Sequence, residues 1–173
     1  VYKRQLRCIA FLYALNNEAI YIKDRKFVVR CTKSGAEVSG NLPTVNKNNN
    51  YYVINFGNNH IAREYPDIEL INLENEYVKL KDSKEFEGIK NFNFSIYQKS
   101  ENNIAIRTYE NGAGETLSCG SATISVACAL MEDTNENELL FSSRGGKTMV
   151  LKDNQSIKSQ ANAVILEQGF LNG

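Results

Sequence analysis

One stretch of ten residues constrains the fold of this chain more than any other. From Ala122 to Met131 the sequence reads ATISVACALM, so apolar or small side chains surround nearly the whole circumference of a helix. Such a helix has no face that favours contact with water, and it is expected inside a domain, covered on every side. The sequence therefore predicts a central buried helix with other structure wrapped around it.

The turn ahead of this helix, Ser118-Cys119-Gly120-Ser121, places a cysteine at its N-terminus. Unpaired backbone N–H groups and the helix dipole favour negative charge at that position. We therefore expect a lowered pKa for the Cys119 thiol. The amides of Gly120 and Ser121 are expected to suit a bound carboxylate.

A second helix is predicted over Arg7–Leu15, which is also apolar almost all round. Both helices end in Ala-Leu, and each is followed by a polar loop and a run of short strands. A unit of helix and sheet that occurs twice predicts two related domains, each a curved sheet around its own helix. The predicted strands are Ile20–Ile22, Phe27–Cys31, Tyr51–Phe56, Asn91–Tyr97, Ile104–Tyr109, Glu138–Ser142, Lys147–Leu151, Ser156–Ser159 and Ala163–Glu167.

Four segments carry more specific expectations. Asn91–Tyr97 alternates as a half-buried strand does. Lys84–Gly88 is expected to be a surface turn or the start of a helix, and Glu132–Glu138 a solvated acidic loop. Ile61–Leu73 fits neither helix nor strand clearly, so its structure stays open.

Composition excludes several classes of function. Twenty basic residues balance twenty acidic ones, which gives no basic surface for nucleic acid or an anionic membrane. No apolar run approaches the roughly 20 residues of a membrane span. The cysteines lack Cys-x-x-Cys spacing, so we expect a reduced, cytoplasmic protein without a metal site. They are Cys8, Cys31, Cys119 and Cys128; Cys8 and Cys128 lie on the predicted helices and are expected in the core.

The segment Arg107–Ser121, RTYENGAGETLSCGS, resembles the second-half signature of the diaminopimelate epimerase family. That signature is an arginine, an aromatic, E-R-G-x-G-E-T, two residues and C-G-[ST]-G. This chain departs from it at Asn111, which replaces an arginine, and at Ala122, which replaces a glycine. The resemblance covers the C-terminal two thirds of the family and implies a chain truncated at its N-terminus.

The resemblance implies an α+β fold. A strongly curved, mostly antiparallel, barrel-like sheet wraps a central buried helix in each of two pseudo-symmetric domains, the first of them incomplete here. Residues 1–45 are then a remnant of the first domain and residues 46–173 the second domain, whose last strands return to the first.

The chemistry implied is cofactor-independent epimerisation of an amino acid. Members of the family use two cysteines, one thiolate base and one thiol acid, on opposite faces of the α-carbon. Cys119 matches the second-domain cysteine. The first should stand in a C-G-N-G-x-R-C run, of which only Arg7-Cys8 remains, with Tyr2 at the position of the catalytic cysteine. We therefore expect residues 1–5 to be non-native sequence and the chain as given to be inactive.

Other site residues follow from the resemblance one at a time. Asn58 and His60 match a G-N-P-H motif, in which the asparagine binds substrate and the histidine supports catalysis. Asn91 resembles the substrate-binding asparagine of an N-x-x-F strand. The expected catalytic residues are Cys119, His60 and Glu110, and the expected substrate-binding residues are Asn58, Asn91, Glu110, Asn111, Gly120 and Ser121.

These matches predict a diaminopimelate epimerase of lysine and peptidoglycan biosynthesis, acting on LL- and meso-2,6-diaminopimelate. No cofactor is expected, the partner is a small amino-acid substrate, and the full-length parent is expected as a possible homodimer. Three alternatives remain open. One is a proline or hydroxyproline racemase, against which Glu110–Thr116 argues. Another is a non-catalytic amino-acid-binding domain, which Asn111 and Ala122 favour. A thiol-redox protein is disfavoured, because no second cysteine lies near Cys119 in sequence.

Overall fold

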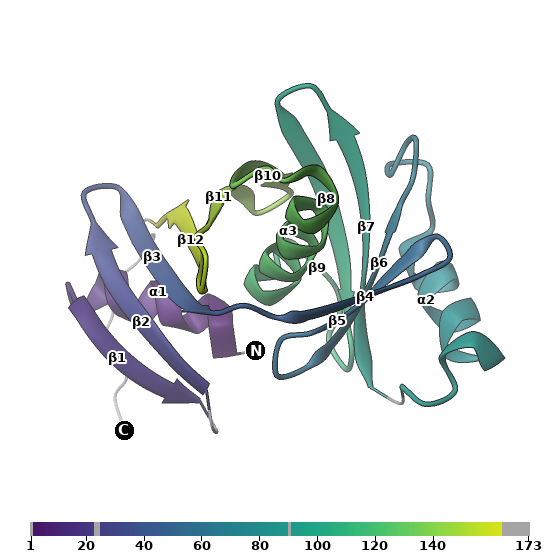
Figure 1. The fold of residues 1–173 in the computed structure, drawn as a ribbon, viewed down its shortest axis with the longest axis horizontal. Helices are drawn as coiled ribbons and strands as arrows, with labels where there is room; N and C mark the ends of the chain where they lie inside the picture. The colour runs from purple at the N-terminus through teal and green to yellow at the C-terminus, as the bar shows by residue number, and fades with distance from the viewer. Residues whose placement is uncertain (1, 23–24, 90, 164–173) are drawn as a thin grey trace, which may run out of the picture.

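The computed structural model describes residues 2–22, 25–89 and 91–163, with side chains from Leu6 onward, and folds them around one continuous, twisted sheet (Figure 1). The strands are β1 (Asn16–Ile22), β2 (Arg25–Thr32), β3 (Gly35–Asn41), β4 (Thr44–Asn48), β5 (Tyr51–Asn55), β6 (Asn59–Glu64), β7 (Phe92–Ser100), β8 (Asn103–Glu110), β9 (Gly114–Thr116), β10 (Glu138–Ser143), β11 (Gly146–Lys152) and β12 (Ser156–Asn162). The helices are α1 (Tyr2–Leu12), α2 (Leu73–Lys81), α3 (Gly120–Thr134) and a single 3₁₀ turn, η1 (Lys84–Phe86).

The order of strands across the sheet is β1-β2-β3-β12-β11-β10-β8-β7-β6-β5-β4, with β9 paired to β8 beside this path. Within the described residues, parallel pairing occurs between β6 and β7 and between β8 and β10, and the other pairs are antiparallel. This confirms the predicted α+β class and the mostly antiparallel sheet. The barrel-like description needs a correction, because the sheet is curved but open, with β1 and β4 at its two ends.

Helix α3 lies in the middle of the molecule, as predicted (Figure 1). All its residues from Gly120 to Met131 are buried. Strands from both halves of the sheet surround it, and its core neighbours include Ile54, Phe141 and Val150. The helix ends at Asn135, whose left-handed backbone (φ 61°) lets its N–H donate to the carbonyl of Met131. Glu132 and Asp133 therefore belong to the helix, not to the predicted acidic loop.

Helix α1 is covered on one side only, contrary to the prediction of a helix buried all round. Leu6 and Ala10 are buried against β2 and β3, whereas Ile9 and Leu12 are 39% and 57% exposed. In the described part of the chain, α1 packs on β2, β3 and the cysteine end of α3, which leaves its other face in solvent. Cys8 lies on that face and is exposed, so the expectation that it is a core residue was wrong.

Strand β7 is buried on both faces, where the sequence predicted a half-buried strand. Alternate side chains such as Tyr97 join the core around α3. The remaining ones, Phe92, Phe94 and Ile96, join a second core built from α2, η1 and β6. Helix α2 was not predicted, and it is what covers the outer face of the sheet at this point (Figure 1).

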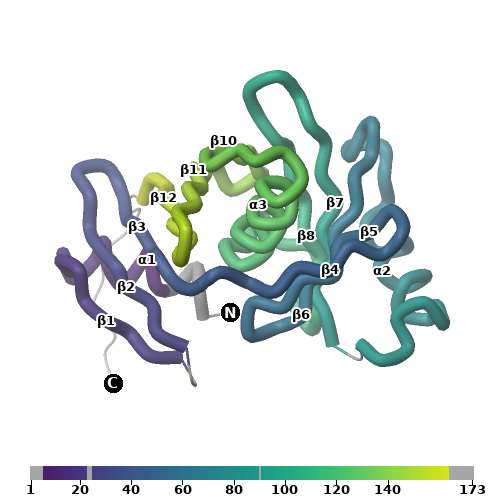
Figure 2. Tube along the Cα trace, viewed as in Figure 1, coloured from purple at the N-terminus to yellow at the C-terminus, as the bar shows by residue number. Residues whose placement is uncertain are grey.

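A strand from the N-terminal part of the chain pairs with the last described strand. Strand β12 pairs with β3 along its whole length, from Ser156 opposite Asn41 to Asn162 opposite Gly35. From β3 the chain continues past α3 into β4 at the far end of the sheet (Figure 2). The predicted strand Ala163–Glu167 lies outside the described residues beyond Ala163. Within the described part, no helix is long and apolar enough to cross a membrane.

Candidate functional site

The segment from Arg107 to Glu115 is held in place by a partly buried ion pair. The Arg107 guanidinium donates from Nε to Oε1 and from Nη2 to Oε2 of Glu115, at 2.8 and 2.9 Å. Its Nη1 donates to the carbonyl oxygens of Ile68 and Ile71 in the loop before α2. A bidentate pair of this kind is directional and strong. It also holds the pKa of Glu115 below its ordinary value, chiefly through the hydrogen bond from Arg107.

The turn between β10 and β11 packs closely against the loop that precedes Cys119. In the turn between β10 and β11, the N–H of Gly145 donates to the carbonyl of Leu117 at 2.7 Å. A Cβ on Gly145 would come within 2.8 Å of the Cβ of Ser118, so no larger residue fits without moving the loop. Arg144 adds an ion pair to Glu115 at 3.1 Å. The residues before Cys119 are therefore fixed from two sides.

Cys119 occupies the N-cap position of α3 and is only 7% exposed. Its Sγ lies 3.4 Å from Oγ of Ser121. Burial, and then the negative charge of Glu110, raise the pKa of the Cys119 thiol above its ordinary value. Hydrogen bonds from Ser121 and the amide of Ala122 oppose this shift without outweighing it. The prediction of a lowered pKa was wrong, because the sequence shows the helix terminus but not how deeply the sulfur is buried.

Glu110, at the end of β8, lies near enough for its charge to act on this thiol. Its Oε1 accepts a hydrogen bond from Oγ1 of Thr116 at 2.6 Å. The structure thus brings together three predicted site residues, Glu110, Cys119 and Ser121, with Thr116 beside them. Thr116 was not among the predicted site residues, although it belongs to the same G-x-G-E-T motif and lies only three residues before Cys119.

A buried asparagine on β7 supports the turn that follows Glu110. Oδ1 of Asn93 accepts a hydrogen bond from the backbone N–H of Asn111 at 3.0 Å, and Asn93 is 8% exposed. The predicted residue Asn91 is exposed just before β7, and its carbonyl oxygen accepts from Nδ2 of Asn59 at 3.2 Å. Asn93 was not predicted as a site residue, because the run Asn-Phe-Asn-Phe does not show which asparagine faces the core.

His60 lies on β6, directly across from Asn93 on β7, and its side chain is fully buried. Phe94 pairs with Tyr109 in the antiparallel β7–β8 ladder, so Asn93 and Glu110 are neighbours at its end. Directly opposed residues on adjacent strands point to the same face of a sheet. His60, Asn93 and Glu110 therefore form a polar row across three strands on the face that carries α3.

The remaining predicted substrate residues lie on turns. Asn58 is exposed in the β5–β6 turn, where its carbonyl oxygen accepts from the N–H of Phe56 at 3.1 Å. Gly57 gives this turn its left-handed backbone (φ 83°). Asn111 is also exposed, but its Oδ1 accepts a hydrogen bond from the hydroxyl of Tyr77 at 2.9 Å. The side chain that replaces the family arginine is thus turned toward α2.

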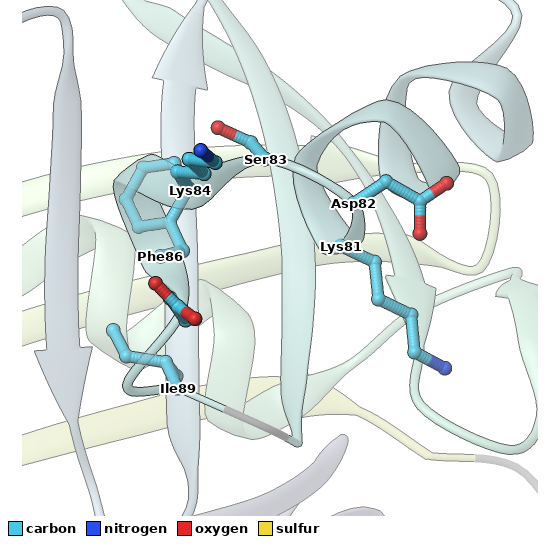
Figure 3. A pocket seen from close by; sticks show the side chains of 7 residues that line it. Lys81, Asp82, Ser83, Lys84, Phe86 and Ile89 are labelled. Atoms are coloured by element: carbon cyan, nitrogen blue, oxygen red, sulfur yellow. The ribbon is translucent and has the colours of Figure 1, made fainter.

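Two other features of the described residues were considered as sites, a metal-binding cluster and a surface hollow. Among the described residues, no group of three or more His, Cys, Asp and Glu side chains could hold a metal ion. A hollow of about 400 Å³ follows α2, and Figure 3 shows Lys81 and Asp82 on one side of it and Phe86 and Ile89 on the other. None of its lining residues is a predicted site residue, and it contains no part of the polar row.

A family model described as diaminopimelate epimerase matches residues 52–166, about two thirds of the chain. The chain belongs to the diaminopimelate epimerase family. The match includes the polar row, the cysteine and the whole of α3, whereas α1 and β1–β4 precede it. A curated diaminopimelate epimerase of Buchnera aphidicola subsp. Baizongia pistaciae is 39% identical over 97 residues, which are 55% of this chain and 33% of that protein. The matched part thus spans about a third of that diaminopimelate epimerase.

Solved structures show the same fold at lower identity. A phenazine biosynthesis PhzC/PhzF protein from Clostridium difficile aligns with a TM-score of 0.64 and 16% identity, covering 95% of this chain and 69% of the other. A PhzF-family protein from Bacillus anthracis aligns with a TM-score of 0.60 and 12% identity, covering 89% and 69%. Because the Clostridium difficile alignment covers 95% of this chain, nearly the whole fold has a counterpart in a solved structure.

Proposed function

We propose that the complete protein to which this chain belongs is a diaminopimelate epimerase, which interconverts LL- and meso-2,6-diaminopimelate without a cofactor. The observation that carries the proposal is the arrangement of Glu110, Cys119 and Ser121 at the start of a buried helix, in a chain of the diaminopimelate epimerase family. Cys119 is then one of two acid/base groups, and the other thiol comes from the first domain.

The position of Cys119 suits both roles that an acid/base thiol must play. Burial and the charge of Glu110 raise its pKa, so at neutral pH the thiol form dominates and has a proton to give to the α-carbon. When Cys119 acts as the base, its proton first moves from sulfur to the Glu110 carboxylate, and the thiolate then takes the α-proton. The same pair of groups therefore serves the reaction in either direction.

The carbanion formed in this reaction needs stabilisation by the protein. Backbone N–H groups of Gly120 and Ser121, in the first turn of α3, are suited to the substrate α-carboxylate, since the first amides of a helix have no intrahelical acceptor. Charge that develops on the carboxylate is then stabilised in a site that excludes water. We assign substrate contacts to Asn58, Asn91 and Asn111, and support of catalysis to His60.

The chain as given is proposed not to epimerise on its own. Tyr2 stands at the position where the family motif has its first catalytic cysteine. Cys8 does not replace that cysteine, because it lies on the exposed face of α1. A single acid/base thiol exchanges a proton on one face of the α-carbon and cannot deliver one to the other.

The test joins a family first half, ending in C-G-N-G, to this chain from Leu6 onward. LL-diaminopimelate is incubated with the chimera in deuterated water, and deuterium at the α-carbon and inversion are followed together. Inversion is expected, and Cys119→Ser is expected to lower its rate by roughly 10²–10⁴-fold, the usual contribution of a positioned acid/base group. A folded chimera that binds diaminopimelate but neither exchanges nor inverts it would refute the epimerase proposal.

A non-catalytic amino-acid-binding domain is the second candidate. It is favoured by one observation, the hydrogen bond from Tyr77 that occupies the side-chain oxygen of Asn111, the residue that replaces the family arginine. Calorimetric binding of diaminopimelate by the chimera without deuterium exchange would select this function. Racemisation of proline by the chimera would instead select a proline-racemase-like activity.

A further inference from the structure

The short strand β9 places two neighbouring side chains on opposite faces of its pairing with β8. Glu115 points to the face of Arg107 and forms the bidentate ion pair described above. Thr116 is the next residue, so its side chain points to the other face, where Glu110 lies. Gly114, directly opposite Glu110 in the β8–β9 ladder, has no side chain to fill the space beside the carboxylate. One three-residue strand thus contains an anchor, Glu115, and a second group that contacts Glu110.

The contact between Thr116 and Glu110 is short and directional. Oγ1 of Thr116 donates to Oε1 of Glu110 at 2.6 Å, which is the range of a charge-assisted O–H···O⁻ bond. Thr116 is itself half-buried, and β9 is fixed to β8 by three residue pairs and by the Arg107–Glu115 ion pair. The hydroxyl is therefore a rigid donor, and it occupies one of the two carboxylate oxygens.

We propose that Thr116 is a positioning residue for the acid/base chemistry of Cys119, because its hydroxyl holds the Glu110 carboxylate in reach of the thiol. With Oε1 bonded to Thr116, Oε2 is the oxygen that exchanges the proton with sulfur. In that step the S–H bond breaks as the O–H bond forms, and the reverse step restores both groups, so no other reactant is needed. This role deepens the proposed function and rests on it, but its direct consequence concerns the thiol alone.

That consequence is a dependence of Cys119 ionisation on the Thr116 hydroxyl. The negative charge of Glu110 is among the causes that raise the pKa of the Cys119 thiol, second to burial. Without the hydroxyl, the carboxylate turns away from sulfur into solvent, and the thiolate forms at lower pH. A hydroxyl that served only to hold the fold would change the stability of the protein but not the pH at which this thiol ionises.

The experiment uses the chain as it stands and needs no substrate. Its thiols are alkylated with iodoacetamide at a series of pH values, and the rate at Cys119 is read from its peptide by mass spectrometry. The exposed Cys8 is the reference in every sample. Thr116→Val is expected to lower the pH midpoint of the Cys119 profile by roughly 1 unit. Thr116→Ser, which keeps the hydroxyl, is expected to retain the wild-type midpoint.

A second pair of variants tests whether Thr116 acts through Glu110. Glu110→Gln is expected to lower the midpoint as Thr116→Val does, and Thr116→Val added to Glu110→Gln should change nothing further. An unchanged midpoint in Thr116→Val overturns the proposal, and so does a shift that persists in the Glu110→Gln background. If Thr116→Val does not fold, Thr116→Ala removes the same hydroxyl without adding bulk. The deuterium-exchange assay tests the epimerase proposal separately, so failures of the two proposals are distinguishable.

Discussion

The guanidinium of Arg7 lies against Gly120, the first residue of α3. A Cβ on Gly120 would come 3.0 Å from Nη2 of Arg7, while Nη1 donates to the buried Oγ of Ser159 at 3.3 Å. Arg7 is 8% exposed and belongs to α1, and Ser159 belongs to β12. The cysteine end of the central helix is therefore held by side chains from near both ends of the chain.

We expect Gly120→Ala to destabilise the protein, because the new methyl group would displace a buried guanidinium. Overpacking in a core costs about 1–3 kcal/mol, which exceeds the 0.5–1 kcal/mol that alanine gains over glycine in a helix. Denaturant unfolding measures the difference. Gly88→Ala is the matched control, since Gly88 is exposed and its Cβ would meet nothing within 4 Å. Equal unfolding free energies for the two variants would show that the Arg7 guanidinium can move away from the new methyl group without destabilising the protein.

The ion pair between Arg107 and Glu115 gives a pH-dependent prediction. Glu115→Gln leaves a buried guanidinium with a weaker partner, and we expect a loss of about 1–3 kcal/mol at pH 7. The pKa of Glu115 is lowered in the folded protein, chiefly by Arg107, so its stabilisation is present above its ordinary pKa of 4.5 and is lost as pH falls. The wild type and the variant should therefore converge in acid.

The control for this ion pair is the exposed one between Lys99 and Glu64, whose side chains are both 46% exposed. Glu64→Gln is expected to change the free energy of unfolding by less than about 1 kcal/mol, as exposed pairs usually do. Urea titrations of both variants at pH 7 and pH 4 make the comparison. A gap between wild type and Glu115→Gln that stays constant down to pH 4 would contradict the assignment.

The buried thiol of Cys128 is expected to make the folded protein less stable in alkaline solution. Burial on α3, the largest cause, raises the pKa of its thiol to about 11 from an ordinary value of 9.0. Above pH 9 the unfolded chain releases this proton more readily than the folded protein, so stability falls as pH rises through the window from 9 to about 11. We expect Cys128→Ala to be less stable than the wild type at pH 7. Between pH 9 and about 11, however, the wild type should lose up to about 3 kcal/mol more unfolding free energy than the variant. If the unfolding free energies of the wild type and Cys128→Ala change with pH at the same slope in this window, the prediction is refuted.

The parts of the fold that sequence patterns predicted are those in which one local signal suffices. The ring of apolar side chains on Ala122–Met131 required a covered helix whatever surrounded it. The predicted strand Tyr51–Phe56 is β-branched and aromatic, and its residues up to Asn55 form β5. Helix α2 was not predicted because Leu73, Tyr77 and Leu80 supply its buried side in a short run that is otherwise mostly charged. Its N-cap, Asn72, resembles the many other asparagines of the chain.

Features that depend on residues far apart in the sequence could not be predicted from local patterns. The apolar faces of α1 gave no sign that strands would cover only one of them. The N-terminal position of Cys119 on α3 was predicted, but the direction of its pKa shift depends on burial by the surrounding sheet and on Glu110. Asn93 was overlooked for a related reason, since its importance comes from the strand register that sets it between His60 and Glu110.

The pairing of β12 with β3 also sets an order of assembly during synthesis. Strands β1–β3 are synthesised before β12, so one edge of β3 lacks its partner until β12, among the last of the described strands, has been made. During that interval the edge presents unpaired backbone groups, a surface on which nascent chains associate. Closing the sheet joins segments far apart in sequence, which is the slow kind of step in folding. A ribosome-bound nascent chain that stops short of Ser156 should therefore leave β1–β3 accessible to chaperones.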